Sequence, residues 1–250
     1  MITKKSKYEL SLMRIAGSIV AEVLYELKEM VKPGVTTWEL DEKAESIIKN
    51  HQAIPTFKGY HGFPGTICAS VNEEVVHGIP SKERVLQEGD VISIDCGATY
   101  KGLVGDSAIT VPVGEIPEDR QMLLKATEEA LYESIKACMT TNYLQEVSGT
   151  IEDISKKYNL GLVRNYGGHG VGRNMHEEPF IHNFRTGQPG PKLKSGMTIC
   201  LEPMFNLGCD DVHTLSDGWT VVTNDGKASA HFEHTVAITK QGPEILTKLS

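Results

Sequence analysis

The segment GDVISID at residues 89–95 returns as GMTICLE at residues 196–202. Each copy begins with glycine, continues with mostly apolar residues and ends in an acid, which is Asp95 in the first copy and Glu202 in the second. Short runs of this kind are typical of buried strands. The copies lie 107 residues apart, and this offset is longer than the roughly 20–50 residues of a solenoid repeat. The pattern therefore predicts one half-domain that occurs twice.

Sequence outside these strands supports the duplication. The same offset carries Leu-Tyr-Glu at 24–26 onto Leu-Tyr-Glu at 131–133, and it matches four residues of segment 39–49 with segment 146–156. We expect one domain over residues 1–250, with halves at about 8–113 and 117–240. Equivalent strand ends would bring two carboxylates together across a pseudo-twofold axis, and divalent ions recruit such hard oxygen ligands.

Each half is expected to contain two helices followed by strands. In the first half, apolar spacing predicts a helix over 8–31, and the capping box of Thr36 with Glu39 opens a second helix. A strand at Thr66–Val71 and a strand pair over 91–113 follow. The second half is expected to contain helices at about 119–139 and 144–158, a glycine-rich loop at 167–172, a strand at 197–202, and a hairpin of strands 218–223 and 229–238 around Asn224-Asp225-Gly226. This order predicts an α/β (α+β) fold in which helices cover a curved, largely antiparallel sheet.

Composition narrows the class of protein. The net charge of −8 and the pI near 5.6 argue against general affinity for nucleic acid or anionic membranes. No apolar stretch is long enough to span a membrane, and the amino-terminal residues do not resemble a signal peptide. The five cysteines are odd in number and form no C-x-x-C motif, so we expect a reducing cytoplasm.

Two further acids and a histidine complete a candidate metal site. Asp106 follows Gly105 on the strand that returns from Asp95, and Glu233 lies on the strand that returns toward Glu202. Taken singly, each acid fits a solvated strand end, but the duplicated placement of Asp95 and Glu202 favours a shared centre. Four buried acids need a cation. His169 lies among glycines that let the backbone approach such a site. One imidazole and four carboxylates suit Mn, Fe, Co or Zn, and bridging carboxylates would hold two ions about 3.5 Å apart around one water.

The set Asp95, Asp106, His169, Glu202 and Glu233, in this order, resembles the dinuclear metal site of the pita-bread metallopeptidases. The segments NEEVVHGIP (72–80), GHGVG (168–172), HEEP (176–179), EPM (202–204), DGWT (217–220) and FEHT (232–235) resemble the methionine aminopeptidase family. Only 30 residues separate Glu202 and Glu233, where type II enzymes carry a helical insertion. No Cys/His zinc motif precedes the domain. The chain is therefore similar to the short type I form.

The resemblance implies a pita-bread fold and an enzyme that hydrolyses the N-terminal methionine from nascent proteins and peptides with a small second residue. A water or hydroxide that bridges two ions (Co, Mn, Fe, Ni or Zn) would carry out the attack. Asp106 and Glu233 would bridge the ions, Asp95 would complete one shell, and His169 and Glu202 would complete the other. Glu202 would also shuttle protons. His77 and His176 would contact the scissile amide.

The resemblance also implies where the methionine side chain binds. The expected substrate-binding residues are Phe57, Tyr60, Phe63, Cys68, His77, Met175, His176 and Trp219. Phe57, Phe63 and Met175 depart from the commoner family pattern, although the pocket stays apolar. Asn72 and Ser229 resemble positions that bind a sodium or potassium ion. The implied partners are N-terminal methionine peptides and nascent chains near the ribosome, and the implied state is a monomer.

Two alternatives remain open at this stage. A proline-directed aminopeptidase of the same superfamily would use the same metals with a different pocket, although such relatives carry an extra N-terminal domain. A metal-less binding protein of this fold would have lost ligands, and all five are present here.

Overall fold

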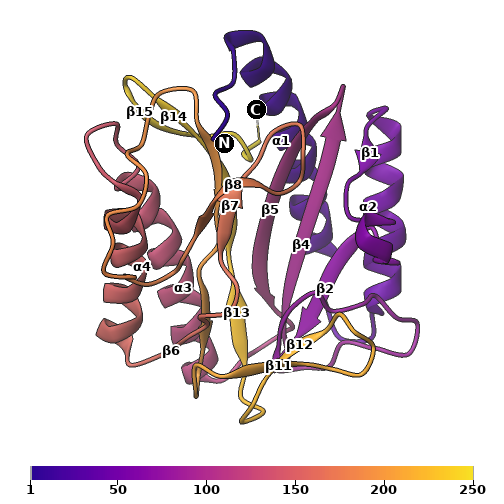
Figure 1. Ribbon diagram of the computed structural model, residues 1–250. Coiled ribbons are helices and arrows are strands. Elements are labelled where there is room, and N and C mark those ends of the chain that lie inside the picture. Colours follow the sequence, from indigo (N-terminus) through magenta and orange to yellow (C-terminus); the bar gives the residue numbers. More distant parts are fainter. Residues whose placement is uncertain (1, 250) are drawn as a thin grey trace.

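The computed structural model describes residues 2–249, which form a nine-stranded sheet covered by four α-helices (Figure 1). The main path of the sheet runs β1-β4-β5-β14-β9-β7-β8, with β2 also on β4 and β15 also on β14. Every pairing in this sheet is antiparallel. The helix–strand composition and the antiparallel sheet confirm the predicted fold class.

The strands of the two halves enter the sheet in mirror order, which confirms the duplication. In the first half, β2 (Ile67–Val71) pairs with β4 (Val91–Tyr100), which pairs with β5 (Leu103–Pro112). In the second half, β7 (Gly168–Gly170) pairs with β9 (Thr198–Leu201), which pairs with β14 (Glu233–Thr239). The returning strands β5 and β14 pair with each other at the centre. The acids on these four strands are thereby brought toward one seam.

The helices form equivalent pairs, one pair to each half. They are α1 (Lys7–Met30), α2 (Thr37–Asn50), α3 (Glu118–Lys136) and α4 (Leu144–Tyr158). Thr36 caps α2 with the predicted capping box, since its side chain accepts from the backbone of Glu39 while Glu39 accepts from Thr36. Figure 1 shows α2 beside β1 on one side of the molecule, and α3 with α4 on the other.

Each half has its own apolar core, and the cores fix the sheet between the helix pairs. In the first half, Val20, Leu27 and Leu40 from the helices bury against Ile94. In the second half, the helical residues Leu123, Leu131 and Ile151 bury in one cluster with Ile199 and Phe205. Burying one such side chain fully contributes about 1.5–3 kcal/mol. The strands that carry the acids are therefore held in place by the helices packed against the sheet.

Short elements complete the chain. They are β1 (Ile54–Pro55), a 3₁₀ turn η1 (Tyr60–Gly62), β3 (Glu74–Val76), β6 (Gly161–Leu162), β8 (Glu177–Ile181), β10 (Met204–Asn206), β11 (Val212–Thr214), β12 (Val221–Thr223), β13 (Ser229–His231) and β15 (Gly242–Ile245). Two small three-stranded sheets, β13-β10-β6 and β11-β12-β3, lie beside the main sheet. No helix within residues 2–249 is long and apolar enough to cross a membrane.

The glycine-rich loop predicted at 167–172 is wrong, because its middle forms strand β7 of the main sheet. A side chain on Gly168 would collide with the carbonyl of Cys200 on β9, and one on Gly170 would collide with the carbonyl of Glu178. The glycines therefore allow close packing between neighbouring strands. They do not mark a flexible loop.

The hairpin predicted around Asn224-Asp225-Gly226 is also wrong. The turn exists, with Gly226 at φ 71°, but the segments on either side pair elsewhere. Strand β12 pairs with β11 and β3, while β13 pairs with β10. Tertiary pairing thus overrides the local turn signal. A smaller difference concerns α3, which ends at Lys136 because the Asn142 side chain donates to the carbonyl of Ala137.

Candidate metal centre and substrate pocket

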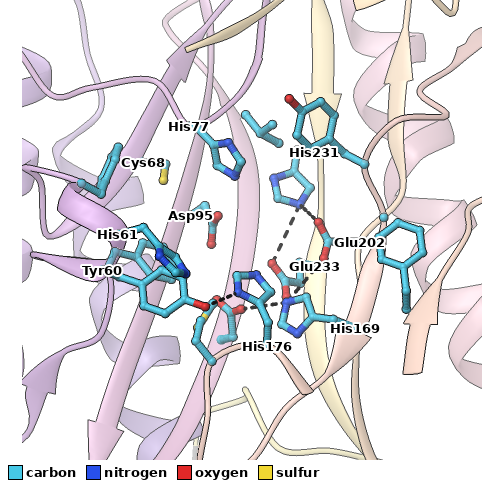
Figure 2. A pocket seen from close by; sticks show the side chains of 18 of the residues that line it. Tyr60, His61, Cys68, His77, Asp95, His169, His176, Glu202, His231 and Glu233 are labelled. Carbon is cyan, nitrogen blue, oxygen red and sulfur yellow. Dashed lines mark hydrogen bonds and ion pairs between the residues drawn. The ribbon is translucent and has the colours of Figure 1, made fainter. Parts of the chain in front are cut away.

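A cavity of about 660 Å³ opens at the seam between the halves. It is lined by all five predicted metal ligands and by every predicted substrate-binding residue, namely Phe57, Tyr60, Phe63, Cys68, His77, Met175, His176 and Trp219. Figure 2 shows the carboxylates of Asp95, Glu202 and Glu233 in the middle of this cavity, with Tyr60 and Cys68 on one side. The structure thus brings together residues that are far apart in the sequence.

Strand register explains why the acids converge. Asp95 on β4 and Glu233 on β14 are both cross-strand partners of Ala108 on β5. Asp106 lies two residues before Ala108, so it points to the same face of the sheet. Glu202 directly follows β9, whose residue Cys200 is the partner of His169 on β7. Every predicted ligand therefore lies on the central sheet or at the end of one of its strands.

The imidazole of His169 is oriented for coordination. Its Nδ1 lies 2.9 Å from the carbonyl oxygen of Gly170 and donates to it. Its Nε2 lies 3.6 Å from Asp106 Oδ2 and 3.6 Å from Glu202 Oε1. A backbone carbonyl on one ring nitrogen fixes the tautomer that leaves the other nitrogen as a metal ligand.

The carboxylates have the character of cation ligands. Asp106 and Glu233 are almost fully buried. Among the described residues, no hydrogen-bond donor reaches Asp95 Oδ1, Asp106 Oδ1 or Glu233 Oε1. Burial, followed by the negative charge of Asp106, raises the pKa of the Asp95, Glu202 and Glu233 carboxyls well above their usual range. Unpaired buried carboxylates are costly, and a divalent cation relieves that cost, so this donor set fits the implied metal.

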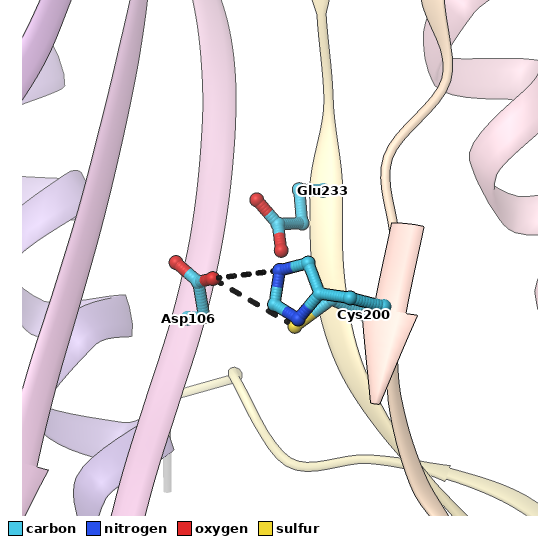
Figure 3. Close-up of side chains that lie close together, drawn as sticks. Asp106, Cys200 and Glu233 are labelled. Atoms are coloured by element: carbon cyan, nitrogen blue, oxygen red, sulfur yellow. Dashed lines mark hydrogen bonds and ion pairs between the residues drawn. The ribbon is translucent and has the colours of Figure 1, made fainter. Parts of the chain in front are cut away.

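A sulfur atom also borders the centre. Figure 3 shows Cys200 beside Asp106 and Glu233, and potential ligand atoms of Asp106, His169, Cys200 and Glu233 all lie within 4.8 Å of one another. The Cys200 sulfur contacts Asp106 Oδ2 at 3.8 Å and Thr235 Oγ1 at 3.5 Å. Burial and the nearby carboxylates raise the pKa of its thiol well above the usual value. We therefore interpret Cys200 as a protonated neighbour of the ligands.

The two histidines predicted to contact substrate lie at the wall of the cavity. His176 Nδ1 is 2.9 Å from the hydroxyl of Tyr60, and its ring centroid lies 4.3 Å from that of His169. Burial lowers the pKa of His176 to about 4, so its imidazole is neutral near pH 7. His77 has the positive φ of 61°, and burial lowers its pKa as well. Its ring lies between those of Tyr166 and Trp219.

His231 is a cavity residue that the sequence interpretation missed. It is buried, and its Nε2 lies 3.8 Å from Glu202 Oε2 and 3.8 Å from Glu233 Oε2 (Figure 2). Burial lowers its pKa to about 3. Its position in the sequence could have predicted it, because a residue two positions before Glu233 on an extended strand faces the same side of the sheet as Glu233. His61, Tyr166 and Phe180 also line the cavity without having been predicted.

The pair suggested for a monovalent cation is adjacent in space. The backbone N–H of Ser229 donates to the carbonyl of Asn72 at 2.9 Å. The Asn72 side chain is already engaged, because it accepts from Arg120 and donates to Asp90. The remaining oxygen of Asn72 is its single main-chain carbonyl, which accepts the bond from Ser229, and the role stays a prediction.

These features define a duplicated α/β fold whose seam carries a buried acid–histidine metal centre, which is the architecture of a metallopeptidase. Residues 11–240 match metallopeptidase family M24. The methionine aminopeptidase of Clostridium acetobutylicum is 50% identical over 247 residues, and methionine aminopeptidase 1 of Bacillus subtilis is 51% identical over 249 residues; each alignment covers at least 99% of both chains. The chain belongs to family M24 and, within it, to the methionine aminopeptidases.

Solved structures agree with this placement. The crystal structure of methionine aminopeptidase from Thermotoga maritima has a TM-score of 0.98 and 45% identity, and the match covers 99% of this chain and 100% of that one. A prolidase from Pyrococcus horikoshii has a TM-score of 0.78 at 23% identity, and the match covers 64% of its length. The prolidase shares the fold alone.

Proposed function

We propose that this chain removes the N-terminal methionine from peptides and nascent proteins whose second residue is small, with two divalent ions in the centre described above. The observation that carries the proposal is the meeting of the five acid and histidine ligands with an apolar side pocket in one cavity. Full-length similarity to methionine aminopeptidases supports it. Action in the cytoplasm, as a monomer near the ribosome, is part of the same proposal.

The proposed ligand roles agree with position. Asp106 and Glu233 lie on the paired central strands β5 and β14, which supports the proposal that they would hold both ions. Asp95 on β4 would complete one coordination shell, and His169 with Glu202 would complete the other. When bound, the ions supply the Lewis acidity that makes amide hydrolysis feasible near neutral pH.

Protein side chains would move the protons and hold the substrate. Glu202 lies at the end of β9 beside the other predicted ligands, where its carboxylate would take a proton from the attacking water and pass it to the leaving amine. His176 is neutral, and in the tautomer whose Nδ1 accepts from the Tyr60 hydroxyl, its Nε2 carries the hydrogen and would donate to the scissile amide. His77 would donate from the opposite wall.

The side pocket accounts for methionine. Phe63 and Trp219 meet edge to face with ring centroids 5.2 Å apart, and Phe57, Cys68 and Met175 are buried beside them in the same apolar cluster. Aromatic rings and sulfur atoms make favourable contacts with a thioether. One methylene discriminates by only about 10–200-fold in such a pocket, so leucine should be removed slowly.

Release of methionine from Met-Ala-Ser tests the proposal directly. Metal-stripped protein should be inactive, and refilling with single ions such as Mn(II), Fe(II) or Co(II) should restore release. Metal analysis should find two ions per chain. Faster cleavage of Ala-Pro-Ala would favour a proline-directed enzyme, and a purified chain that binds no ion would favour a binding protein.

A further inference from the structure

We propose that strand β8 carries a second binding surface, which holds the part of the substrate peptide that follows the scissile bond. The inference rests on the proposed function, since it concerns the same substrate. It goes beyond the methionine pocket because it assigns a preference for apolar side chains at the third and fifth substrate residues.

The surface is a row of three rings on one face of β8 and the segment after it. Phe180 on β8, and His182 and Phe184 in the bend that follows it, alternate with the buried residues Ile181 and Asn183. The ring centroids of Phe180 and His182 are 4.8 Å apart, and those of His182 and Phe184 are 5.0 Å apart. We call these three residues the aromatic row.

Phe180 is exposed to an unusual degree for a phenylalanine in a sheet. Its side chain retains 47% of its accessible surface. The far end of the row is fixed in place, because the guanidinium of Arg164 lies 4.7 Å from the Phe184 ring while Arg164 also pairs with Asp210. Exposed aromatic groups in a contiguous row mark interaction surfaces more often than solitary exposed residues do.

The row begins at the metal centre. Phe180 lines the cavity, and it is the cross-strand partner of the metal ligand His169. A Cβ atom built on Gly167 would lie 3.3 Å from Phe180 Cζ, so the ring covers the backbone next to the ligand strand. Strand β8 is the last strand on its side of the main sheet, beyond β7. The aromatic row therefore starts at the cavity and continues along the edge of the sheet.

The occupant that fits this surface is the substrate's own extended chain. Cys68 of the methionine pocket lies on β2, Phe180 lies on β8, and the strands that carry the ligands lie between them in the sheet. With the first residue in the methionine pocket, the residues after the scissile bond would therefore extend toward β8. Side chains two residues apart in an extended peptide are about 6.6–7 Å apart and face the same way. If the third residue contacts Phe180, the fifth reaches His182 and Phe184. An apolar or aromatic side chain gains from each contact.

Matched peptides test this surface. Met-Ala-Leu-Ser-Leu-Ser and Met-Ala-Ser-Ser-Ser-Ser share the first two residues and the length, and Met-Ala-Ser measures basic cleavage in each variant. In the wild-type chain we expect KM for the leucine peptide to be roughly threefold to tenfold lower than for the serine peptide, the scale of one or two aromatic contacts. Phe180→Ser should bring this ratio close to one, and Phe180→Trp should preserve it.

Tyr25→Ser is the control, because Tyr25 is similarly exposed, at 51%, but lies on α1 and does not line the cavity. It should leave the ratio unchanged. A ratio near one in the wild-type chain, or an unchanged ratio in Phe180→Ser, overturns the inference even when Met-Ala-Ser is cleaved. Failure to cleave Met-Ala-Ser is a failure of the proposed function. In that case calorimetric binding of the two hexapeptides still decides the inference, since equal Kd values contradict it.

Discussion

Replacing Tyr60 with phenylalanine removes one hydroxyl group and leaves the pocket wall in place. That hydroxyl lies 2.9 Å from His176 Nδ1, and burial raises the pKa of Tyr60, so the hydroxyl stays protonated and able to donate to Nδ1. Without it, the His176 ring is less well fixed in the orientation and tautomer that present Nε2–H to the substrate. A neutral hydrogen bond contributes about 0.5–1.5 kcal/mol, and each 1.36 kcal/mol changes a rate about tenfold. We therefore expect kcat on Met-Ala-Ser to fall roughly twofold to tenfold.

The pH dependence of this loss separates orientation from titration. The pKa of His176 is lowered to about 4, so its imidazole stays neutral from about pH 6 to about pH 8 in both forms. The loss in kcat should therefore be constant over that range, with KM changed little because the aromatic ring remains. Steady-state rates at saturating metal measure both quantities.

A matched control is present in the second half of the chain. Tyr132 on α3 places its hydroxyl 3.5 Å from His234 Nε2, with ring centroids 5.8 Å apart, outside the cavity. Tyr132→Phe should leave kcat unchanged. An unchanged kcat in Tyr60→Phe, or an equal loss in Tyr132→Phe, would refute the role given to the Tyr60 hydroxyl.

Three further predictions concern the metal centre. Asp106→Ala should lose both ions and all activity, because one carboxylate serves both sites; two tightly bound ions in this variant, measured by metal analysis, would contradict the ligand assignment. In metal-free protein, the raised pKa values of Asp95, Glu202 and Glu233 mean that the folded chain holds protons that the unfolded chain releases. The free energy of unfolding of the metal-free protein should therefore fall as pH rises from about 4 through those raised values. Added Mn(II) at roughly 100 times its Kd should raise that free energy by about 2.7 kcal/mol. If the difference in melting temperature between metal-loaded and metal-free protein does not grow with pH, this prediction is wrong. His231→Phe should weaken metal affinity or activity by roughly 10–100-fold, the usual scale for a group that orients ligands. His231→Gln should retain much of the affinity and activity that His231→Phe loses, with metal affinity measured by calorimetry and activity measured as kcat.

Local pattern was enough to predict the scaffold of this protein. The apolar runs that end at Asp95 and Glu202 became β4 and β9, and the capping box at Thr36 opened α2. These features depend on neighbours in sequence. Strand β7 forms because it pairs with β9, and β12 and β13 pair with different strands instead of with each other. These partners lie far along the chain, so glycine content and turn residues gave wrong predictions for both segments. His231 lies two residues before Glu233 and on the same face, but its closeness to Glu202 depends on the pairing of distant strands, which local pattern does not reveal.

The two halves contribute differently to the cavity. One reason is that the number of residues between the two acids differs from one half to the other. Ten residues separate Asp95 from Asp106, whereas 30 separate Glu202 from Glu233. The longer segment forms β10 to β13 and brings Trp219 and His231 to the cavity. Because the duplicated strands supply equivalent acids, they can form the acidic part of a metal centre, to which only the second half adds a histidine, His169. The unrepeated segments make the cavity asymmetric, since residues 57–63 of the first half also contribute Phe57, Tyr60 and Phe63 to the methionine pocket. We therefore infer that the repeated strands supply most of the metal ligands, and that the unrepeated segments of both halves determine which side of the scissile bond receives methionine.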